Sequence, residues 1–514
     1  MTAVTLNPAT YRSLGDFLAR IEQAGGLVRV TAPVSTRLEM TEIQTRLLAE
    51  GGPAVLFEKP IRADGRASAM PVLVNLFGTV ERVAWGLGCE VAGLRDLGER
   101  LAALQSPDPV DGVRDAIDRL PLLRAAMTMR PKSVRAAPVM QVVCEGDAVD
   151  LTQLPVQCCW PGEPAPLITW PLVITKGPGE AREDTYNMGV YRMQVLDERR
   201  AIIRWLAQRG GARHHRLWAE RGEPMPVAVA IGADPGTMLA AVTPVPELLS
   251  EYRFAGLLRG AKLELAPCRT VPLKVPAHAE IVLEGHVSIE ETAPEGPYGD
   301  HTGYYNAVES FPVFTVSAIA RRQKPIYLST FTGRPPDEPS VMARALNEVF
   351  LPLLRRQFPE IVDCYLPPEA CSYRVAVVSI AKRYPGQARR VMMGLWSLLP
   401  QFSYTKLIIV VDEDIDARDW RDVMWAIATR SDAARDAMIV DNTPIDYLDF
   451  ASPRSGLGGK MGIDATNKIG GETDREWGVP LRMSDEVVRA VDEKWAALGL
   501  PGSGRAIWRQ RPKS

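Results

Sequence analysis

The stretch PEGPYGDHTGYY, residues 294–305, is the one around which the rest of the chain is organised. Its three glycines and two prolines exclude a long helix and predict a loop with a fixed, irregular path. The loop carries two carboxylates, Glu295 and Asp300, and His301 follows the second one. Burial and neighbouring charge push such a pair of acids to different protonation states, which suits a proton donor beside a charged neighbour. The simpler interpretation is a tight turn with solvated acids. No role is assigned to His301.

Composition indicates a globular protein with an unremarkable surface. The chain has 514 residues, of which 46% are hydrophobic and 24% charged, so two or three domains are expected. A net charge of −2 argues against a nucleic-acid partner held by bulk phosphate attraction. Seven scattered cysteines without Cys-x-x-Cys spacing favour reduced thiols. The first ten residues do not resemble a signal peptide, and no apolar run reaches the roughly 20 residues that cross a bilayer. We therefore expect a cytoplasmic protein.

Periodicity divides the chain into five parts. Residues 1–130 read as a small α/β domain, with a capped helix at about 14–24. Residues 131–332 contain strand after strand, from 139–144 to 313–319, which predicts a barrel or a strongly bent sheet. A helical connector is expected at 333–358, and residues 359–480 predict a mainly parallel, helix-covered sheet. A helix and a basic tail are expected at residues 481–514.

Three later features receive their own interpretation. The acids at 412–416 follow an apolar strand and are expected to cap a helix, with a metal site as the weaker alternative. The run Gly456–Lys460 is not a phosphate loop, because Arg454 and Met461 stand where that motif needs Gly and Ser or Thr. The apolar stripe of the last helix is expected to dock on another subunit or on the chain's own core, and the basic tail allows weak contact with an anionic membrane.

A second group of polar residues lies upstream of the loop. Asn187 and Arg192 are an odd number of positions apart, so on a straight strand they would face opposite sides. Either the strand bulges, or the two residues serve different ends of a long ligand of flavin size. Asn187, His214 and Glu251 form a mixed set that suits Mn or Mg together with a phosphate, although each residue alone is more often structural.

These blocks together resemble the UbiD family of prenylated-flavin decarboxylases. The likeness follows the chain in order and continues beyond the loop. The blocks that carry it are NMGVYR at 187–192, RWL at 204–206 with Arg209 and Gly210, SEYRFAG at 250–256, EGPYGD at 295–300, GRPPDEP at 333–339, RVMMG at 390–394, NTPIDYLDFASP at 442–453 and KMGIDATNK at 460–468. The later blocks are similar to the ubiquinone-pathway branch of the family.

The resemblance implies a fold, a reaction and a set of site residues. The fold is mixed α/β (α+β), with an N-terminal α/β domain, a split β-barrel that binds flavin, a helical connector and a C-terminal α/β oligomerisation domain. The reaction is the non-oxidative decarboxylation of 3-polyprenyl-4-hydroxybenzoate to 2-polyprenylphenol in ubiquinone biosynthesis, through a covalent adduct with prenylated FMN. Arg192, Glu295 and Asp300 would be catalytic, with Asp300 as the proton donor. Asn187, His214 and Glu251 would hold Mn2+ or Mg2+, and His214 is the less secure ligand because His215 follows it. The residues that would line the cofactor are Val190, Tyr191, Arg192, Arg204, Trp205, Leu206, Arg209, Gly210 and Lys406.

Partners also follow from the resemblance. It implies a hydrophobic aromatic acid as substrate, a separate flavin prenyltransferase that supplies the cofactor, a potassium ion beside the phosphate, and a homo-oligomer, either a dimer or a hexamer. Contact with the inner face of the cell membrane is a further expectation. Three alternatives stay open: a family member acting on a smaller aromatic or heteroaromatic acid, a metal-dependent hydrolase built on Glu295, Asp300 and His301, and a non-catalytic scaffold of a quinone-synthesis complex.

Overall fold

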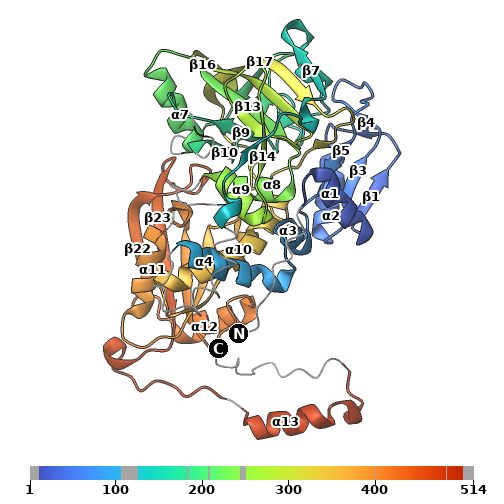
Figure 1. The fold of residues 1–514 in the computed structure, drawn as a ribbon. Helices are drawn as coiled ribbons and strands as arrows, with labels where there is room; N and C mark the ends of the chain where they lie inside the picture. Colours follow the sequence, from blue (N-terminus) through green and yellow to red (C-terminus); the bar gives the residue numbers. More distant parts are fainter. Residues whose placement is uncertain are drawn as a thin grey trace, which may run out of the picture. The chain divides into compact units, whose positions relative to one another are not determined.

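The computed structural model describes residues 11–105, 126–180, 182, 185–205, 209–243, 250–398, 400–481 and 483–501 (Figure 1). The chain divides into two compact units. The first comprises Met1–Leu353 and Pro368–Ser372, and the second comprises Leu354–Pro367 and Tyr373–Ser514. Strands and helices are present in both units, which confirms the predicted mixed class. The predicted helix and basic tail at 481–514 are described only as far as residue 501.

The N-terminal part of the first unit begins with the predicted capped helix. Ser13 accepts a hydrogen bond from the Asp16 amide and the Asp16 side chain returns one, so the capping box is confirmed. The helix buries its apolar stripe, and Figure 1 shows it beside a small sheet in the order β1-β3-β5-β18. Helix α4 was not predicted. The bounds are α1 Leu14–Gln23, β1 Leu27–Val30, β2 Val34–Ser35, α2 Glu39–Ala49, β3 Ala54–Phe57, β4 Pro60–Ile61, β5 Val72–Val74, α3 Val80–Gly86, α4 Leu94–Gln105 and β18 Tyr327–Leu328.

The central part is a nine-stranded antiparallel sheet. Its order is β10-β9-β13-β16-β17-β12-β11-β8, and β7 also pairs with β17. Helix α7 packs on β9, β10, β13 and β16, and helices α8 and α9 pack on each other. The bounds are β7 Val142–Glu145, β8 Leu167–Ile168, β9 Leu172–Thr175, β10 Asn187–Val190, β11 Met193–Val195, β12 Arg200–Ile203, α7 Gly210–Ala219, β13 Met225–Ile231, α8 Pro235–Val242, α9 Glu251–Arg259, β16 Ile281–Glu295 and β17 Glu309–Arg321. A smaller sheet joins β6 Lys132–Ser133, β14 Glu264–Pro267 and β15 Lys274–Pro276.

One connection shows how strongly this sheet curls. Strands β10 and β11 follow each other with only Tyr191 and Arg192 between them, yet they lie near opposite ends of the strand order. Two residues span only about 7 Å when extended, so the two ends of the sheet must approach each other. The predicted single strand 188–195 is therefore wrong, and the predicted bent sheet is confirmed. Arg192 stands at the crossing between the two ends.

The longest hairpin of the sheet leads directly into the glycine-rich loop. Strands β16 and β17 pair from Ile281 with Arg321 to Glu295 with Glu309, and the register shifts twice along β16. The sequence predicted only 281–283 and 313–319 as strand, because the outer half of this hairpin is rich in exposed polar residues. As a result, Glu295 ends a strand and Asp300 lies in the loop beyond it.

A single apolar core serves both sheets of the first unit. The ring of Phe77 lies 5.9 Å from Phe17 in α1 and 5.7 Å from Trp170 next to the central sheet. Buried aliphatic residues of both sheets belong to the same cluster. The positions of the central strands are thus fixed partly by packing against the N-terminal helices. Helix α10, Glu338–Gln357, matches the predicted connector helix.

The second unit is built on a five-stranded sheet in the order β19-β20-β21-β23-β22. Two of its four pairings are parallel and two antiparallel, so the sheet is mixed rather than mainly parallel as predicted. Strands β19 and β23 were missed. Gly462 of β23 meets Met392 of α11, whereas the neighbouring Ile463 packs in the α12 cluster, so the two helices cover opposite faces. The bounds are β19 Ile361–Tyr365, β20 Val375–Ile380, α11 Gln387–Leu398, β21 Leu407–Asp412, α12 Trp420–Arg430, β22 Ala437–Pro444, β23 Leu457–Ala465 and α13 Asp485–Lys494.

The acids after β21 form ion pairs instead of a helix cap, so that prediction is wrong. Arg430 donates to Asp412 at 2.9 Å and to Asp414 at 2.9 Å, while α12 begins later and is capped by Asp419. Burial raises the pKa of Asp412 to about 6, even though Arg430 and the Asn467 amide lower it. The ion pairs with Arg430 therefore engage Asp412 and Asp414, and Asp419 caps the helix in their place.

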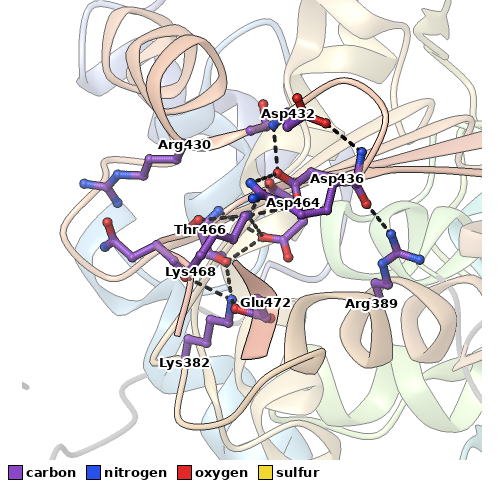
Figure 2. A network of polar contacts seen from close by, with 12 residues as sticks. Lys382, Arg389, Arg430, Asp432, Asp436, Asp464, Thr466, Lys468 and Glu472 are labelled. Carbon is purple, nitrogen blue, oxygen red and sulfur yellow. Dashed lines mark hydrogen bonds and ion pairs between the residues drawn. The ribbon is translucent and has the colours of Figure 1, made fainter. Parts of the chain in front are cut away.

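Two buried lysines complete this edge of the sheet (Figure 2). Lys468 Nζ lies 3.1 Å from Asp464 and 3.4 Å from Asp436, and its side chain is 1% exposed. Lys382 Nζ donates to Thr466 at 2.8 Å and to Glu472 at 2.6 Å. The parallel strands β20, β21 and β23 all end here, so their carboxyl ends bring these residues together. We call this set the lysine–carboxylate network.

The last helix makes no buried contact within the described part of the chain. None of the residues of α13 is buried, so the predicted docking on the chain's own core is not found. Docking on another subunit stays a prediction. Among the described helices, none combines the length and the apolar character required to cross a membrane.

Candidate active site

Arg192 reaches both acids of the glycine-rich loop. Its Nε donates to Glu295 Oε1 at 2.8 Å, its Nη1 donates to Asp300 Oδ2 at 2.8 Å, and its Nη2 lies 3.2 Å from Glu295 Oε2. Glu295 is fully buried, and the side chains of Arg192 and Asp300 are 14% and 12% exposed. A planar guanidinium between two carboxylates is a strong, geometrically fixed arrangement. The structure therefore gathers the three predicted catalytic residues, although Arg192 precedes the two acids by more than a hundred positions.

Two residues that the sequence did not single out complete this cluster. Asn306 Oδ1 accepts from Arg192 Nη2 at 2.7 Å and from the Tyr298 amide at 2.8 Å, while its Nδ2 lies 3.5 Å from Glu295. Glu309 accepts from Arg204 Nη2 at 2.7 Å. Glu309 is the cross-strand partner of Glu295. A sequence signal for Glu309 would have required the hairpin register, which places the two acids opposite each other.

Arg204 lies behind Glu295. Its Nη1 donates to Glu295 Oε2 at 2.5 Å, its guanidinium stacks 5.1 Å from the Phe311 ring, and its side chain is 4% exposed. Glu295 thus accepts hydrogen bonds from two arginines, which offset the cost of burying its charge. Arg204 contacts Glu295, Glu309 and Phe311, and its contact with a cofactor stays a prediction.

The loop follows the irregular path that its glycines require. Gly296 has φ +91°, a conformation that side chains with a Cβ rarely adopt. A Cβ on Gly299 would lie 2.1 Å from the Trp160 ring, so only glycine lets the loop pack on that indole. Thr332 Oγ1 donates to the Gly299 carbonyl at 3.1 Å and Trp160 Nε1 donates to the Thr332 carbonyl at 2.9 Å. The solvated-turn interpretation is therefore wrong: the loop is packed and its acids are buried.

Burial and neighbouring donors act in opposite directions on the pKa of Asp300. Burial alone would raise the pKa of Asp300, but the hydrogen bond from His301 and the charge of Arg192 together lower that pKa to about 2. His301 provides its Nδ1 at 2.8 Å and its backbone amide at 2.8 Å, both to Asp300 Oδ1. Nearby, burial raises the pKa of Glu163, whose Oε2 accepts from the Cys159 amide at 2.6 Å. Because each loop acid is bonded to Arg192, the set does not resemble a hydrolase metal site.

The three predicted metal ligands meet at the start of β10. Asn187 pairs across the sheet with Thr175, whose hydroxyl lies 2.9 Å from His214 Nδ1, and the amide of Met188 donates to Glu251 at 3.1 Å. His215 points elsewhere, since its Nε2 lies 2.9 Å from the Ser288 carbonyl. His214 is thus the histidine of the pair that contacts Thr175, the cross-strand partner of Asn187.

The surroundings of these residues fit a cation. Burial raises the pKa of Glu251 to about 7, and only backbone amides act against it. Burial also lowers the pKa of His214, which keeps the imidazole neutral, and Thr175 fixes one ring nitrogen. In the part of the chain that the structure describes, no three His, Cys, Asp or Glu side chains gather in a metal-holding group. A cation here would therefore also need the Asn187 oxygen and oxygens from a bound phosphate.

The residues predicted to line a flavin are grouped around Tyr191. Its ring lies 5.0 Å from that of Trp205, and its hydroxyl accepts from the Gly211 amide at 3.3 Å. A Cβ on Gly210 would lie 2.1 Å from Asn187 Oδ1. Within the described ranges, Trp205 Nε1 is a buried donor without a hydrogen-bond partner, which is a cost that a bound acceptor would relieve.

The remaining predicted cofactor residues are distributed as follows. Val190 ends β10, and Arg209 directly precedes α7. Leu206 lies outside the described residues. Lys406 belongs to the second unit, where its Nζ lies 3.0 Å from Asp449.

Comparison with known families and structures gives consistent matches along the chain. Models described as the N-terminal, Rift-related and C-terminal domains of 3-octaprenyl-4-hydroxybenzoate carboxy-lyase (UbiD) match residues 18–101, 132–335 and 340–465. The chain is similar to the UbiD-class enzyme HmfF of Pelotomaculum thermopropionicum in complex with FMN, at 30% identity over 91% of this chain and 97% of that one, with a TM-score of 0.75. An evolved dimeric form of that enzyme with prFMN matches at 28% identity, 91% and 97% coverage and a TM-score of 0.73. Vanillic acid decarboxylase of Sedimentibacter hydroxybenzoicus in its closed form matches at 27% identity, 95% and 99% coverage and a TM-score of 0.80.

Proposed function

Because the chain belongs to the UbiD family of carboxy-lyases, we propose that it removes CO2 from an aromatic acid with the help of prenylated FMN. The observation that carries the proposal is the guanidinium of Arg192 held between Glu295 and Asp300. A UbiD-class relative of similar fold binds FMN, and an evolved form of it binds prFMN. Prenylated FMN, when bound, supplies the sink for the electrons that CO2 leaves behind, which no side chain offers.

The side chains around it bind the substrate and handle the proton. Arg192 presents a planar set of donors that matches the substrate carboxylate. Glu295, fixed by Arg192, Arg204 and Asn306, keeps that guanidinium in one orientation. Asp300 delivers a proton to the carbon that has lost CO2, as a general acid. Burial of the loop against Trp160 limits access of water to these groups.

The group at the start of β10 is proposed to anchor the cofactor. Asn187, His214 and Glu251 would hold Mn2+ or Mg2+, and the ion would bind the cofactor phosphate. The chemistry of the three groups and the raised pKa of Glu251 support this assignment. Val190, Tyr191, Trp205, Leu206, Arg209 and Gly210 are proposed to line the cofactor; the contribution of Lys406 and of a potassium ion belongs to the same proposal.

We propose 3-polyprenyl-4-hydroxybenzoate, the acid of the ubiquinone pathway, as the substrate. The blocks at 442–453 and 460–468 and the matching family description support this choice. Asp300 has a shorter side chain than a Glu at that position, and it would leave room for a prenylated ring. The second candidate is a smaller aromatic acid, which the likeness to vanillic acid decarboxylase favours.

The surroundings of the enzyme are part of the same proposal. A flavin prenyltransferase would supply the cofactor, and the protein would work in the cytoplasm as a homo-oligomer. The exposed apolar residues of the 479–500 segment, such as Val479 and Leu481 at 90% and 89% exposure, support a docking role on a second copy or on a membrane surface. The five-part domain division at 130, 332, 358 and 480 is retained as a proposal.

The test is an anaerobic assay of protein coexpressed with a flavin prenyltransferase. Prenylated 4-hydroxybenzoate, 4-hydroxybenzoate and vanillate are compared, and we expect CO2 release from the prenylated acid. Glu295→Gln and Asp300→Asn should lower kcat by at least about 10²-fold, since each removes a group that acts in proton transfer or positioning. Glu291→Gln, an exposed acid on the same strand, is the matched control and should leave kcat unchanged.

Two outcomes would change the proposal. Turnover restricted to the unprenylated acids would replace the ubiquinone substrate by the smaller one. No turnover of any acid by protein whose absorbance and mass show the cofactor, or wild-type rates in Asp300→Asn, would refute the assignment.

A further inference from the structure

The proposed reaction consumes one proton in every turnover. The C–C bond to the carboxylate breaks, CO2 leaves, and the electron pair at the ring carbon finally takes a proton. If Asp300 gives that proton, it ends each cycle as a carboxylate and has to be protonated again. The contacts of Asp300 show which neighbour can do this.

Asp300 is surrounded by hydrogen-bond donors. Its Oδ2 accepts from Arg192 Nη1 at 2.8 Å, and its Oδ1 accepts from the backbone amide of His301 and lies 2.8 Å from His301 Nδ1. These contacts keep the pKa of Asp300 near 2 in spite of burial, so the carboxyl group is ionised here. An ionised carboxylate can only accept, so His301 Nδ1 carries the proton in this contact.

Only one of the three donors can release a proton near neutral pH. A guanidinium does not deprotonate in proteins, and a backbone amide does not act as an acid, whereas imidazole titrates in the physiological range. The His301 side chain is 19% exposed and its Nε2 is buried, so the ring is recharged by water that reaches Nδ1, the atom that faces Asp300.

Several charged groups lie near His301. Asp300 bonds to one side of the ring. Burial raises the pKa of Asp337, and the charge of His301 opposes this in part, so Asp337 lies within electrostatic range of the ring. The nearby cations are Arg192, which lies beyond Asp300, and Arg334, which packs beside Gly303 of the loop.

We propose that His301 returns a proton to Asp300 after each turnover. This inference rests on the proposed function. The Nδ1–H bond of the imidazolium breaks, an O–H bond forms at Asp300 Oδ1, and the neutral ring then takes a proton from water. A substrate carboxylate that occupies Arg192 Nη1 removes one of the bonds that keep Asp300 ionised, so the transfer becomes favourable when substrate is bound. His301 acts through Asp300 and touches no reacting atom.

The kinetic test uses two variants of the cofactor-loaded enzyme. His301→Asn keeps a donor near Asp300 but cannot titrate, and His301→Ala removes the ring. We expect kcat to fall by about 10²-fold in both variants, while KM stays within about twofold of wild type. The limb of the pH profile that reflects titration of His301 should be absent. Added imidazole should restore at least about tenfold of the loss in His301→Ala and nothing in His301→Asn. His286→Asn, an exposed histidine of β16, is the control.

A second readout needs neither cofactor nor turnover. In cofactor-free protein with ¹³C-labelled aspartate, infrared difference spectra against Asp300→Asn report the carboxyl band of Asp300. We expect its titration midpoint to rise in His301→Ala, because the hydrogen bond and charge of His301 lower that pKa.

The outcomes separate this inference from the proposed function. Wild-type kcat and pH profile in folded His301→Asn, or no imidazole rescue in His301→Ala, would overturn the role of His301 while leaving the decarboxylase intact. An unchanged infrared midpoint would overturn it as well. Absence of decarboxylation in the loaded wild type would instead refute the proposed function, which the infrared experiment does not test.

Discussion

Glu338, at the start of α10, is a carboxyl group enclosed in the core of the first unit. The amide of Phe77 donates to Oε1 at 2.7 Å and Thr330 Oγ1 donates to Oε2 at 2.5 Å. Burial raises the pKa of Glu338 to about 7, and the hydrogen bonds from Thr330 and Phe77 and the charge of Arg82 oppose this only in part. At physiological pH the group is therefore close to its midpoint.

This pKa predicts a pH-dependent stability. Between the ordinary pKa of 4.5 and about 7, the folded chain binds a proton that the unfolded chain has released, so stability falls as pH rises. Glu338→Gln can still accept from Phe77 and can donate to Thr330 Oγ1, as the protonated acid does, so we expect it to match wild type at pH 5 and to exceed it at pH 8 by on the order of 3 kcal/mol. Urea unfolding at both pH values measures this. Glu81→Gln, an exposed acid of α3, should behave alike at both, and equal stability of Glu338→Gln and wild type at pH 8 would contradict the assignment.

For single residues of the site, the sequence allowed a prediction only where an unusual combination of residue types drew attention to them. Glu295, Asp300 and Arg192 stood out because acids and glycines share a short loop and an arginine follows a glycine-containing strand. Asn306 did not, because an asparagine after two tyrosines has many ordinary explanations. Its importance arises only when the loop folds back and places its amide between Arg192 and Tyr298.

Among the elements, the hairpin β16–β17 has the greatest influence on the site, because it ends at Glu295. Its length was underestimated, since exposed polar strands lack the apolar alternation on which sequence reasoning depends. The break between β10 and β11 was also unpredictable from periodicity. It depends on closure of the sheet, which is a long-range property.

A glycine in this hairpin offers a test at the same scale. A Cβ on Gly285 would lie 2.0 Å from the Thr315 carbonyl of the neighbouring strand, at a position where the register shifts. We expect Gly285→Ala to force the two strands apart and to cost at least about 3 kcal/mol. Thermal and urea unfolding measure this cost.

The matched control is a glycine with free space around it. Gly15 lies inside α1, and an added Cβ would meet only Ser13 Oγ at 3.6 Å, so Gly15→Ala should be neutral or stabilise by about 0.5–1 kcal/mol. If both variants were equally stable, close strand approach at Gly285 would not limit the sheet.

For the molecule as a whole, the two units are stabilised differently. The first has one large apolar core, whereas the second adds the lysine–carboxylate network to a smaller apolar cluster. The sequence predicted the apolar parts of both, because hydrophobic runs mark buried strands. It could not predict the network, because its charges lie far apart in the chain and each alone is typical of a solvated surface.

Lys468 provides the test of that network. Lys468→Met removes the ammonium group that lies between Asp464 and Asp436 and leaves two buried carboxylates without that partner. We expect a loss of about 3–5 kcal/mol in unfolding free energy. Asp464→Asn in the same chain should recover part of it. Lys494→Met on the exposed α13 is the control, and a Lys468→Met variant within about 0.5 kcal/mol of wild type would contradict the structural role.

In the small sheet β1-β3-β5-β18, the strand β18 comes from a part of the sequence that follows all strands of the central sheet. On the ribosome, β5 emerges long before β18, and at about 5–20 residues per second the delay is roughly 10–50 s. During that interval the edge of β5 has unpaired amide and carbonyl groups, which are a template for pairing with another chain. Synthesis of this protein therefore includes a period in which its first sheet is unfinished, however stable the completed chain is.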